Sequence, residues 1–265
     1  MTTPTQQNIL PWLKTRSFGQ RLIYERSLSS SNRTAMELAE LGEPEGLLVV
    51  AESQSAGRGR QNHTWFSPPD KNLYFSLILR PQIPPVRLPE LALLAALSLR
   101  KAIETLLPAV RIGLKWPNDL WIEKRKISGI LCESAQHLQH GLQVIVGIGL
   151  NVNCSLEDFP AELQQSASSL QIAAGSPQNR ARLLAVILNC MEEYYQAWHQ
   201  QSNLAAFLPE WEQADILLGK TITLHQPNRT LTGTALGLAK DGRLKMRLAD
   251  ASQILVSCGD TSLSG

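Results

Sequence analysis

The segment between residues 51 and 79 places a loop rich in glycine and arginine between two apolar strands. The loop, SQSAGRGRQNHTW, sets Gly57 and Gly59 beside Arg58 and Arg60. Glycines let successive backbone N–H groups point into one concavity, and arginines add forked donors for a carboxylate or phosphate. The segment therefore predicts an anion-binding loop, with a simple solvated loop as the alternative.

Hydrophobic periodicity predicts the helices and strands around this loop. Residues 47–52 form a continuous apolar run, and residues 73–79 alternate with the two-residue period of a strand. Three further strands are expected between residues 111 and 153, the last two as a hairpin joined by AQHLQHG. Helices are expected at residues 33–41, 88–107, 179–200 and 204–214.

The order of these elements predicts an α+β fold. Strands outnumber helices and several connect by short turns, which favours a mixed, mainly antiparallel sheet with flanking helices. After Leu218, short strands punctuated by QPNR and KDG are typical of a small antiparallel barrel. We expect a large domain over residues 1–215 and an all-β module over residues 216–265.

Composition excludes several classes of protein. Hydrophobic residues make up 43% of the 265 residues and charged ones 18%, with a formal net charge of +2. This balance lacks the concentrated basic face of non-specific nucleic-acid binders. No signal-peptide pattern and no run of ~18 apolar residues is present, and the scattered cysteines favour a reducing compartment. We expect a cytoplasmic protein that binds neither nucleic acid nor membranes.

A second cationic stretch, LKWPNDLWIEKRKISGIL, begins at residue 114. Asn118 and Asp119 follow a proline at a strand exit, where their side chains are free to bind a ligand. Lys126 enters the next strand and could point into a cleft, or it could belong to a charged hairpin tip. Trp65 could stack on a base, although core packing is the alternative. Neither a P-loop nor a Rossmann glycine motif is present, so a nucleotide site here would be of another kind.

Taken together, these motifs make the chain resemble biotin–protein ligases. The resemblance runs from about residue 29 to the C-terminus and rests on an ordered set of segments: SSSN, ESQSAGRGR, WFSP, NLYFSLIL, LKWPNDL, KISGIL and GIGLNVN. Each segment alone is a weak signal, and the order and spacing of the whole set make the resemblance specific.

The resemblance implies an activity. Such enzymes join biotin and ATP to form biotinyl-5'-AMP, releasing pyrophosphate, and transfer the biotinyl group to a lysine of the biotin carboxyl carrier protein of acetyl-CoA carboxylase, releasing AMP. It also implies an SH3-like C-terminal barrel and leaves a homodimer open. The rival interpretation is a lipoate- or octanoate-protein ligase or transferase of the same fold, which is not expected to carry the K-W-P-N-D turn. A binding module without activity would need the loss of Arg58 or Lys126.

Residue roles follow from the resemblance by matching motif positions. Biotin contacts are implied for Ser30, Ser31, Asn32, Gln54, Arg58, Gly59, Arg60, Lys126 and Gly129. ATP contacts are implied for Arg60, Trp65, Asn118, Asp119 and Asn151. Lys126 and Arg58 would be catalytic, and Asp119 would contact Mg²⁺.

Three departures from the family pattern put single contacts in doubt. Residues 61–64 read QNHT where further basic residues are common, which predicts a lighter grip on phosphate. Ser29 stands in place of an aspartate, and the C-terminus lacks a basic residue. The biotin loop begins near residue 29, whereas bifunctional members carry a DNA-binding helix-turn-helix domain before it, so a monofunctional ligase is expected.

Overall fold

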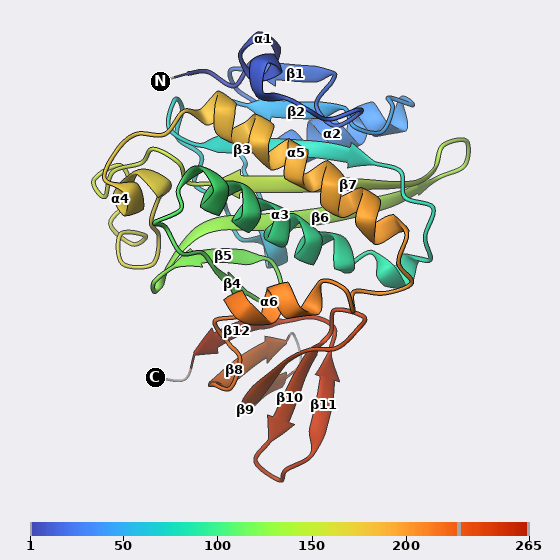
Figure 1. The fold of residues 1–265 in the computed structure, drawn as a ribbon, viewed down its shortest axis with the longest axis vertical. Helices are drawn as coiled ribbons and strands as arrows, with labels where there is room; N and C mark the ends of the chain where they lie inside the picture. The colour runs from blue at the N-terminus through green and yellow to red at the C-terminus, as the bar shows by residue number, and fades with distance from the viewer. Residues whose placement is uncertain (1, 227–228, 264–265) are drawn as a thin grey trace.

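A seven-stranded sheet forms the centre of the molecule (Figure 1). The computed structural model describes residues 2–226 and 229–263. The strands, in the order β1-β2-β3-β7-β6-β5-β4, are β1 (Leu22–Glu25), β2 (Leu48–Ala51), β3 (Leu73–Leu79), β7 (Gly141–Leu150), β6 (Arg125–His137), β5 (Asp119–Ile122) and β4 (Gly113–Lys115). Within the described residues, β1 and β2 are the only neighbouring strands of this sheet that pair in parallel. The predicted mixed, mainly antiparallel sheet is confirmed.

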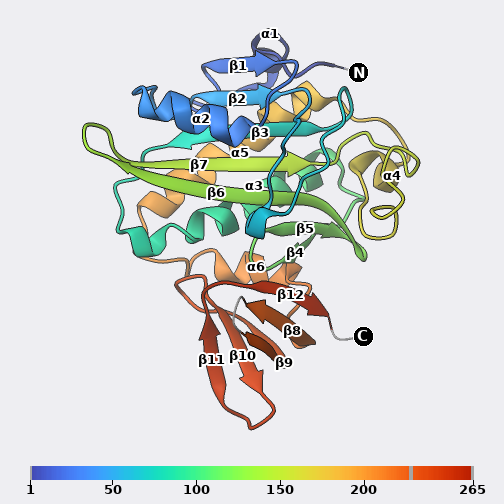
Figure 2. The same ribbon diagram turned by 180° about the vertical axis from the view of Figure 1, so that it is seen from behind.

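Helices cover both faces of this sheet. The long helices α3 (Glu90–Leu106) and α5 (Arg180–His199) pack together on one face, as Figure 1 shows. Helix α2 (Ser31–Glu40) lies on the other face (Figure 2). Strand β3 explains the arrangement, because Phe75 and its alternate neighbours join the α3/α5 core whereas Ile78 packs with α2. The remaining helical segments are α1 (Gln6–Ile9), η1 (Leu10–Trp12), η2 (Arg60–Asn62), η3 (Pro85–Arg87), α4 (Leu170–Ala174) and α6 (Leu208–Ala214).

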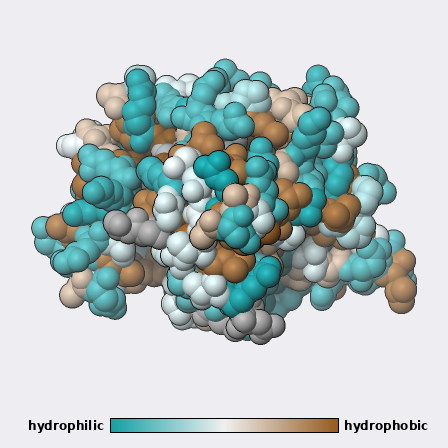
Figure 3. All heavy atoms as spheres, turned by 90° about the horizontal axis from the view of Figure 1, so that it is seen from below, coloured by the Kyte–Doolittle hydropathy of each residue, from teal (hydrophilic) through white to brown (hydrophobic). Residues whose placement is uncertain are grey.

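The C-terminal part of the chain forms a second, antiparallel sheet. Its strands, in the order β11-β10-β9-β8-β12, are β11 (Gln253–Val256), β10 (Leu244–Leu248), β9 (Arg229–Leu238), β8 (Thr221–Gln226) and β12 (Asp260–Leu263). Within the described residues β11 and β12 do not pair, so the sheet is open, and an SH3-like description is compatible with it. Figure 3 shows hydrophilic and apolar residues interspersed at this end of the molecule. Across the described ranges, no helix has the length and apolar character needed to span a membrane.

Most expected elements form, and the differences have local causes. Strand β1 was not predicted; it is short and only partly buried. Two short strands, β4 and β5, flank the turn around residues 116–118, where a single strand was expected. The helix expected at residues 204–214 begins only at Leu208, because the Leu204 N–H donates to the Lys240 carbonyl, 2.8 Å away, and so holds this segment against the C-terminal sheet.

A buried ion pair fixes both ends of the glycine- and arginine-rich loop. Glu52, directly after β2, pairs with Arg180 of α5, and each side chain is 1% exposed. The Glu52 carboxylate also accepts hydrogen bonds from the Tyr24 hydroxyl (2.6 Å) and the Asp70 N–H (2.9 Å). Arg180 donates to the carbonyl of Asn72, just before β3. Burial, together with the Glu52 carboxylate, raises the pKa of Tyr24. The loop therefore starts and ends at one buried charged cluster, next to the end of β2 and the start of β3.

Replacing Arg180 tests the weight of this cluster. Arg180→Met should lower the free energy of unfolding by about 3–5 kcal/mol, because it leaves the buried Glu52 carboxylate without its counter-ion. Adding Glu52→Gln should recover part of the loss, since an amide needs no counter-ion. Urea denaturation measures both changes. The exposed Arg182, which covers the Trp12 ring, is the control, and Arg182→Met should cost about 1 kcal/mol or less. A loss below that level for Arg180→Met would show that the pair is not stabilising.

Candidate active site

A pocket of about 400 Å³ opens on the sheet face that α2 covers. The loop after β2 crosses this face in front of the sheet (Figure 2). Side chains from the start of α2, the loop, β4 to β7 and β12 line the pocket. All predicted site residues are among them: Ser30, Ser31, Asn32, Gln54, Arg58, Gly59, Arg60, Trp65, Asn118, Asp119, Lys126, Gly129 and Asn151. The fold thus brings together residues from distant motifs, while their individual roles stay predictions.

Glycines form the floor of the pocket. Gly129 of β6 and Gly149 of β7 are cross-strand partners, and Gly147 lies two residues before Gly149 on the same face. A Cβ at Gly147 would lie 1.8 Å from the Asn32 Oδ1, and one at Gly149 would lie 2.4 Å from the indole of Trp65. Side chains at these positions would push α2 and the loop off the sheet. The glycine motif in this part of the sequence therefore reflects close approach to the sheet.

Hydrogen bonds order the polar end of the pocket. The buried Ser76 hydroxyl lies 2.6 Å from the Asn32 Oδ1 and 2.8 Å from the Ser31 Oγ. An amide oxygen only accepts, so the single Ser76 hydrogen goes to Asn32. The Ser31 hydroxyl has one hydrogen for two acceptors, Ser76 Oγ and Gln54 Oε1, the latter 3.2 Å away. Gln54 Oε1 accepts from the Ser31 N–H at 2.8 Å. The serine and glutamine that sequence analysis assigned to a ligand are thus held in fixed orientations by the protein.

Asn32 is bound by the protein on both sides of its amide. Its Nδ2 donates to Glu133 Oε2 (2.8 Å) and to the Leu131 carbonyl (3.2 Å), while its Oδ1 accepts from Ser76. Both amide hydrogens are therefore used within the protein. This arrangement makes Asn32 a support for the polar end more than a free ligand donor.

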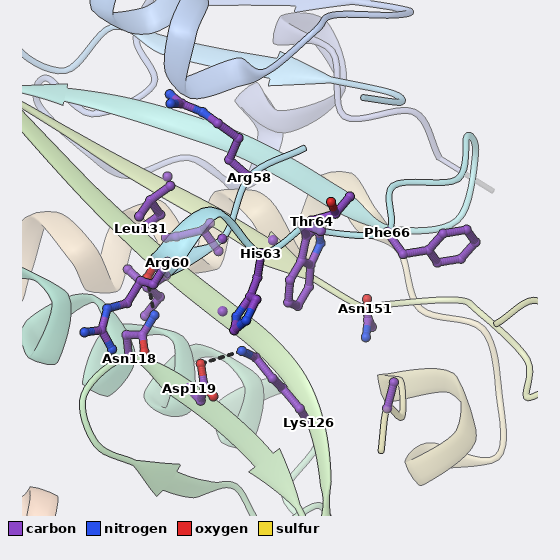
Figure 4. Close-up of a pocket in the computed structure, with 18 of the residues that line it drawn as sticks. Arg58, Arg60, His63, Thr64, Phe66, Asn118, Asp119, Lys126, Leu131 and Asn151 are labelled. Atoms are coloured by element: carbon purple, nitrogen blue, oxygen red, sulfur yellow. Dashed lines mark hydrogen bonds and ion pairs between the residues drawn. The ribbon is translucent and has the colours of Figure 1, made fainter. Parts of the chain in front are cut away.

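The two arginines of the loop bind different parts of the molecule. Arg58 Nη2 forms an ion pair with Glu133 Oε2 at 3.0 Å, and Figure 4 shows its side chain directed away from Lys126. Arg60 Nη1 lies 3.2 Å from Asp260 Oδ1 and donates to the Gly259 carbonyl at 3.3 Å. Both residues line one pocket, but Arg58 is held at the polar end because Glu133 is its ion-pair partner. Arg58 and Lys126 line the same pocket, and their catalytic roles stay predictions.

Lys126 forms the cationic centre of the pocket. Its Nζ lies 2.6 Å from Asp119 Oδ1 and 5.5 Å from the ring centroid of Trp65. Figure 4 shows Lys126 and Asp119 facing each other, with His63 of the loop directed toward them. The buried Nε1–H of Trp65 has no partner in the described part of the chain. The indole lies against Gly149, so this donor faces the glycine floor.

Two of the predicted nucleotide residues serve the backbone. Asn118 Nδ2 donates to the Ile130 carbonyl at 2.6 Å, and the Asn118 carbonyl accepts from the Ile130 N–H. Asn151 Nδ2 donates to the Ser168 carbonyl at 3.0 Å. These asparagines line the pocket and hold its rim in place through their hydrogen bonds to the backbone.

Sequence analysis missed the contribution of the C-terminal sheet. Asp260 and Thr261 of β12 line the pocket. The Thr261 hydroxyl donates to the Trp116 carbonyl, and the Trp116 indole N–H donates to the Gly242 carbonyl, both at 3.1 Å. The turn that carries Asn118 is therefore attached to the C-terminal sheet at two points. No local motif marks these contacts, because they join residues more than a hundred positions apart.

The residues present fit a magnesium ion that arrives with a nucleotide, but not a metal cage made by the protein alone. Among the described residues, no group of three or more histidine, cysteine or acidic side chains could hold a metal ion. Mg²⁺ in nucleotide sites commonly takes only one or two protein carboxylates and completes its shell with phosphates and water. Asp119, for which the resemblance implies this contact, lines the pocket beside Lys126.

Comparisons with known proteins agree with this geometry. Residues 24–151 match the Biotin/lipoate A/B protein ligase family, and residues 217–264 match the Biotin protein ligase C terminal domain. The chain is 41% identical over 232 residues to the bifunctional ligase/repressor BirA of Bacillus subtilis, which covers 88% of this chain and 71% of that protein. It is 29% identical over 221 residues to the biotin–[acetyl-CoA-carboxylase] ligase of Mycobacterium tuberculosis, covering 82% and 78%.

A solved structure is similar over nearly the same length. It is the biotin protein ligase of Aquifex aeolicus in complex with biotin and ATP, with a TM-score of 0.81 and 28% identity. The match covers 92% of this chain and all of that one.

An isosteric change at Asn32 tests the hydrogen-bond arrangement at the polar end. Asn32→Asp replaces two donated hydrogen bonds by repulsion between its carboxylate and Glu133. The free energy of unfolding should fall by about 1–3 kcal/mol in urea denaturation. Glu133→Gln in the same chain restores a donor and should recover part of this loss. Equal stability of the wild type and Asn32→Asp would mean that the Asn32 amide is oriented differently.

Proposed function

Because the chain belongs to the biotin protein ligase family, we propose that this pocket is where it joins biotin to ATP and passes the biotinyl group to a carrier lysine. The chain is an ATP-dependent ligase that forms biotinyl-5'-AMP and then an amide bond, with acetyl-CoA carboxylase as the recipient complex. The observation that supports the site is the presence of an ordered polar end and the Lys126–Asp119 pair within one pocket of about 400 Å³. The recipient is a lysine of the biotin carboxyl carrier protein.

The polar end takes the ureido ring of biotin. A buried ring amide needs hydrogen-bond partners, and Ser31 and Gln54 are held in place to provide them. Ser30 lies beside them at the start of α2. The pocket of about 400 Å³ takes the apolar ring system between the polar end and Lys126. Biotin would thus lie across β7 with its carboxylate toward β6.

Lys126 acts on the carboxylate and the α-phosphate. In the first step a carboxylate oxygen forms a bond to the α-phosphorus, and the bond to the bridging oxygen of the departing pyrophosphate breaks. Negative charge builds on the phosphoryl oxygens, and an ammonium fixed beside them stabilises it. Asp119 holds Lys126 in this position before the substrates enter. In the second step the carrier amine attacks the acyl carbon, and AMP leaves.

The glycine- and arginine-rich loop closes the pocket through Arg58 and Arg60, which lie on either side of Gly59 in the sequence. Arg58 is attached to Glu133 at the biotin end, and Arg60 is attached to Asp260 at the nucleotide end. Trp65 lines the pocket and covers the adenine side. Closure excludes water from an adenylate that water would otherwise hydrolyse. Mg²⁺ that accompanies ATP would be held by Asp119 together with the phosphates.

The second candidate is a ligase for lipoate or octanoate. The family that matches residues 24–151 includes both biotin and lipoate enzymes. The match of residues 217–264 to a C-terminal domain of biotin protein ligases favours biotin.

A carrier-labelling assay tests the function. Purified protein with ATP, Mg²⁺, biotin and a biotin carboxyl carrier domain should yield biotinylated carrier and pyrophosphate. Mass spectrometry measures the biotinylated carrier, and the amount of pyrophosphate released measures the first step. Lipoate in place of biotin should leave the carrier unlabelled. Labelling by lipoate but not by biotin would reverse the choice between the two candidates.

Removing the ammonium of Lys126 tests its role. Lys126→Ala should slow single-turnover formation of biotinyl-AMP by about a hundredfold, equivalent to ~3 kcal/mol of transition-state stabilisation. Lys124→Ala removes the same charge from an exposed residue outside the pocket and should leave the rate unchanged. Thermal unfolding checks that both variants are folded. Unchanged adenylation in Lys126→Ala would refute the role.

A further inference from the structure

Lys115 differs from the other cations of the pocket because it has no ion-pair partner within the described residues. Four lysine and arginine side chains line the pocket. Arg58 pairs with Glu133, Arg60 with Asp260, and Lys126 with Asp119. No carboxylate in the described part of the chain lies within ion-pair distance of Lys115. Among the described residues, Lys115 is therefore the one of these four cations without an ion-pair partner.

The surroundings of Lys115 make an unpaired ammonium costly. Its Nζ lies over the ring of Trp121, 4.8 Å from the centroid. The pKa of Lys115 is lowered, chiefly because burial removes the ammonium from water. The nearby Lys126 also lowers this pKa, whereas Asp119 and Asp260 raise it. An anion that enters the pocket would supply the missing partner and relieve this cost.

The order of the strands places Lys115 beyond the reacting centre. The polar end of the pocket lies at α2, β3 and residues 131–133 of β6. Lys126 lies near the start of β6 and pairs with Asp119 of β5, and Lys115 is on β4, the last strand of the sheet. Lys115 and Asp119 are direct cross-strand partners. A ligand that extends from the polar end through Lys126 therefore reaches Lys115 last.

Adenylation chemistry assigns an anion to that position. The attacking carboxylate oxygen and the leaving oxygen lie on opposite sides of the α-phosphorus. With biotin on the α2 side of Lys126, the leaving group points toward β5 and β4. Resting on the proposed function, we propose that Lys115 binds the β- and γ-phosphates of ATP and so holds the departing pyrophosphate.

The assignment gives the residues around the phosphates separate roles. Lys126 acts at the bond that forms, and Lys115 acts at the group that leaves. Arg60 lies at the nucleotide end of the pocket as well, but its guanidinium already forms an ion pair with Asp260. Departures from the family pattern at residues 61–64 leave no arginine or lysine in that part of the loop, which increases the share of the phosphate charge that falls to Lys115.

Separating the two steps of the reaction tests this inference. Lys115→Met keeps the aliphatic stem over Trp121 and removes the charge. It should raise the KM for ATP and the inhibition constant of pyrophosphate by about tenfold each. The dissociation constant for biotin and the rate of transfer from preformed biotinyl-AMP to the carrier should stay within about twofold, because neither involves pyrophosphate. Lys115→Arg should retain most of the affinity for pyrophosphate.

Lys124→Met is the matched control, since it removes the same charge from an exposed residue nearby and should change none of these constants. Unchanged pyrophosphate inhibition in Lys115→Met would overturn the inference. Equal losses in both steps would also overturn it, because they would show that Lys115 only supports the fold. Failure of the wild-type protein to label the carrier would instead count against the proposed function.

Discussion

Burial of the Glu52 carboxylate beside Arg180 is the constraint on which the site depends. A charge removed from water needs a partner and further hydrogen bonds, and here these come from β1, α5 and the segments at each end of the loop. The loop between β2 and β3 therefore has fixed ends and a glycine-rich middle. Its middle crosses the pocket, where Arg58 and Arg60 tie it to Glu133 and Asp260.

The glycine floor and the loop serve opposite needs of the same reaction. Gly147 and Gly149 allow Asn32 and Trp65 to approach the sheet closely, which narrows the pocket. Arg58 and Arg60 bring positive charge, and carboxylates on β6 and β12 compensate both before substrates bind. The pocket can thus hold several cationic side chains close together, because the carboxylates reduce the repulsion between them. Substrates that carry a carboxylate and phosphates can then take over from the protein carboxylates.

Sequence motifs predict which residues line the pocket, but not which side chains form ion pairs with one another. Lys126 and Asp119 could be assigned to one site because each belongs to a motif with a fixed place in the chain. The pairing of Arg58 with Glu133 could not, because strand periodicity says which face a residue occupies and not which partner it meets. Asp260 lies 200 residues from Arg60 in a strand without a motif, so only the fold reveals their contact. Strand β1 escaped prediction because a short, half-buried run has weak periodicity.

The double attachment of Trp116 has a bearing on how such a protein can change over time. Its carbonyl is held by Thr261 and its indole by the Gly242 carbonyl, so the C-terminal sheet forms one wall of the reaction chamber. A lineage that lost or exchanged this sheet would unseat the neighbouring turn and admit solvent at once. The geometry of the pocket therefore depends on both sheets together, even though each sheet has its own set of strands.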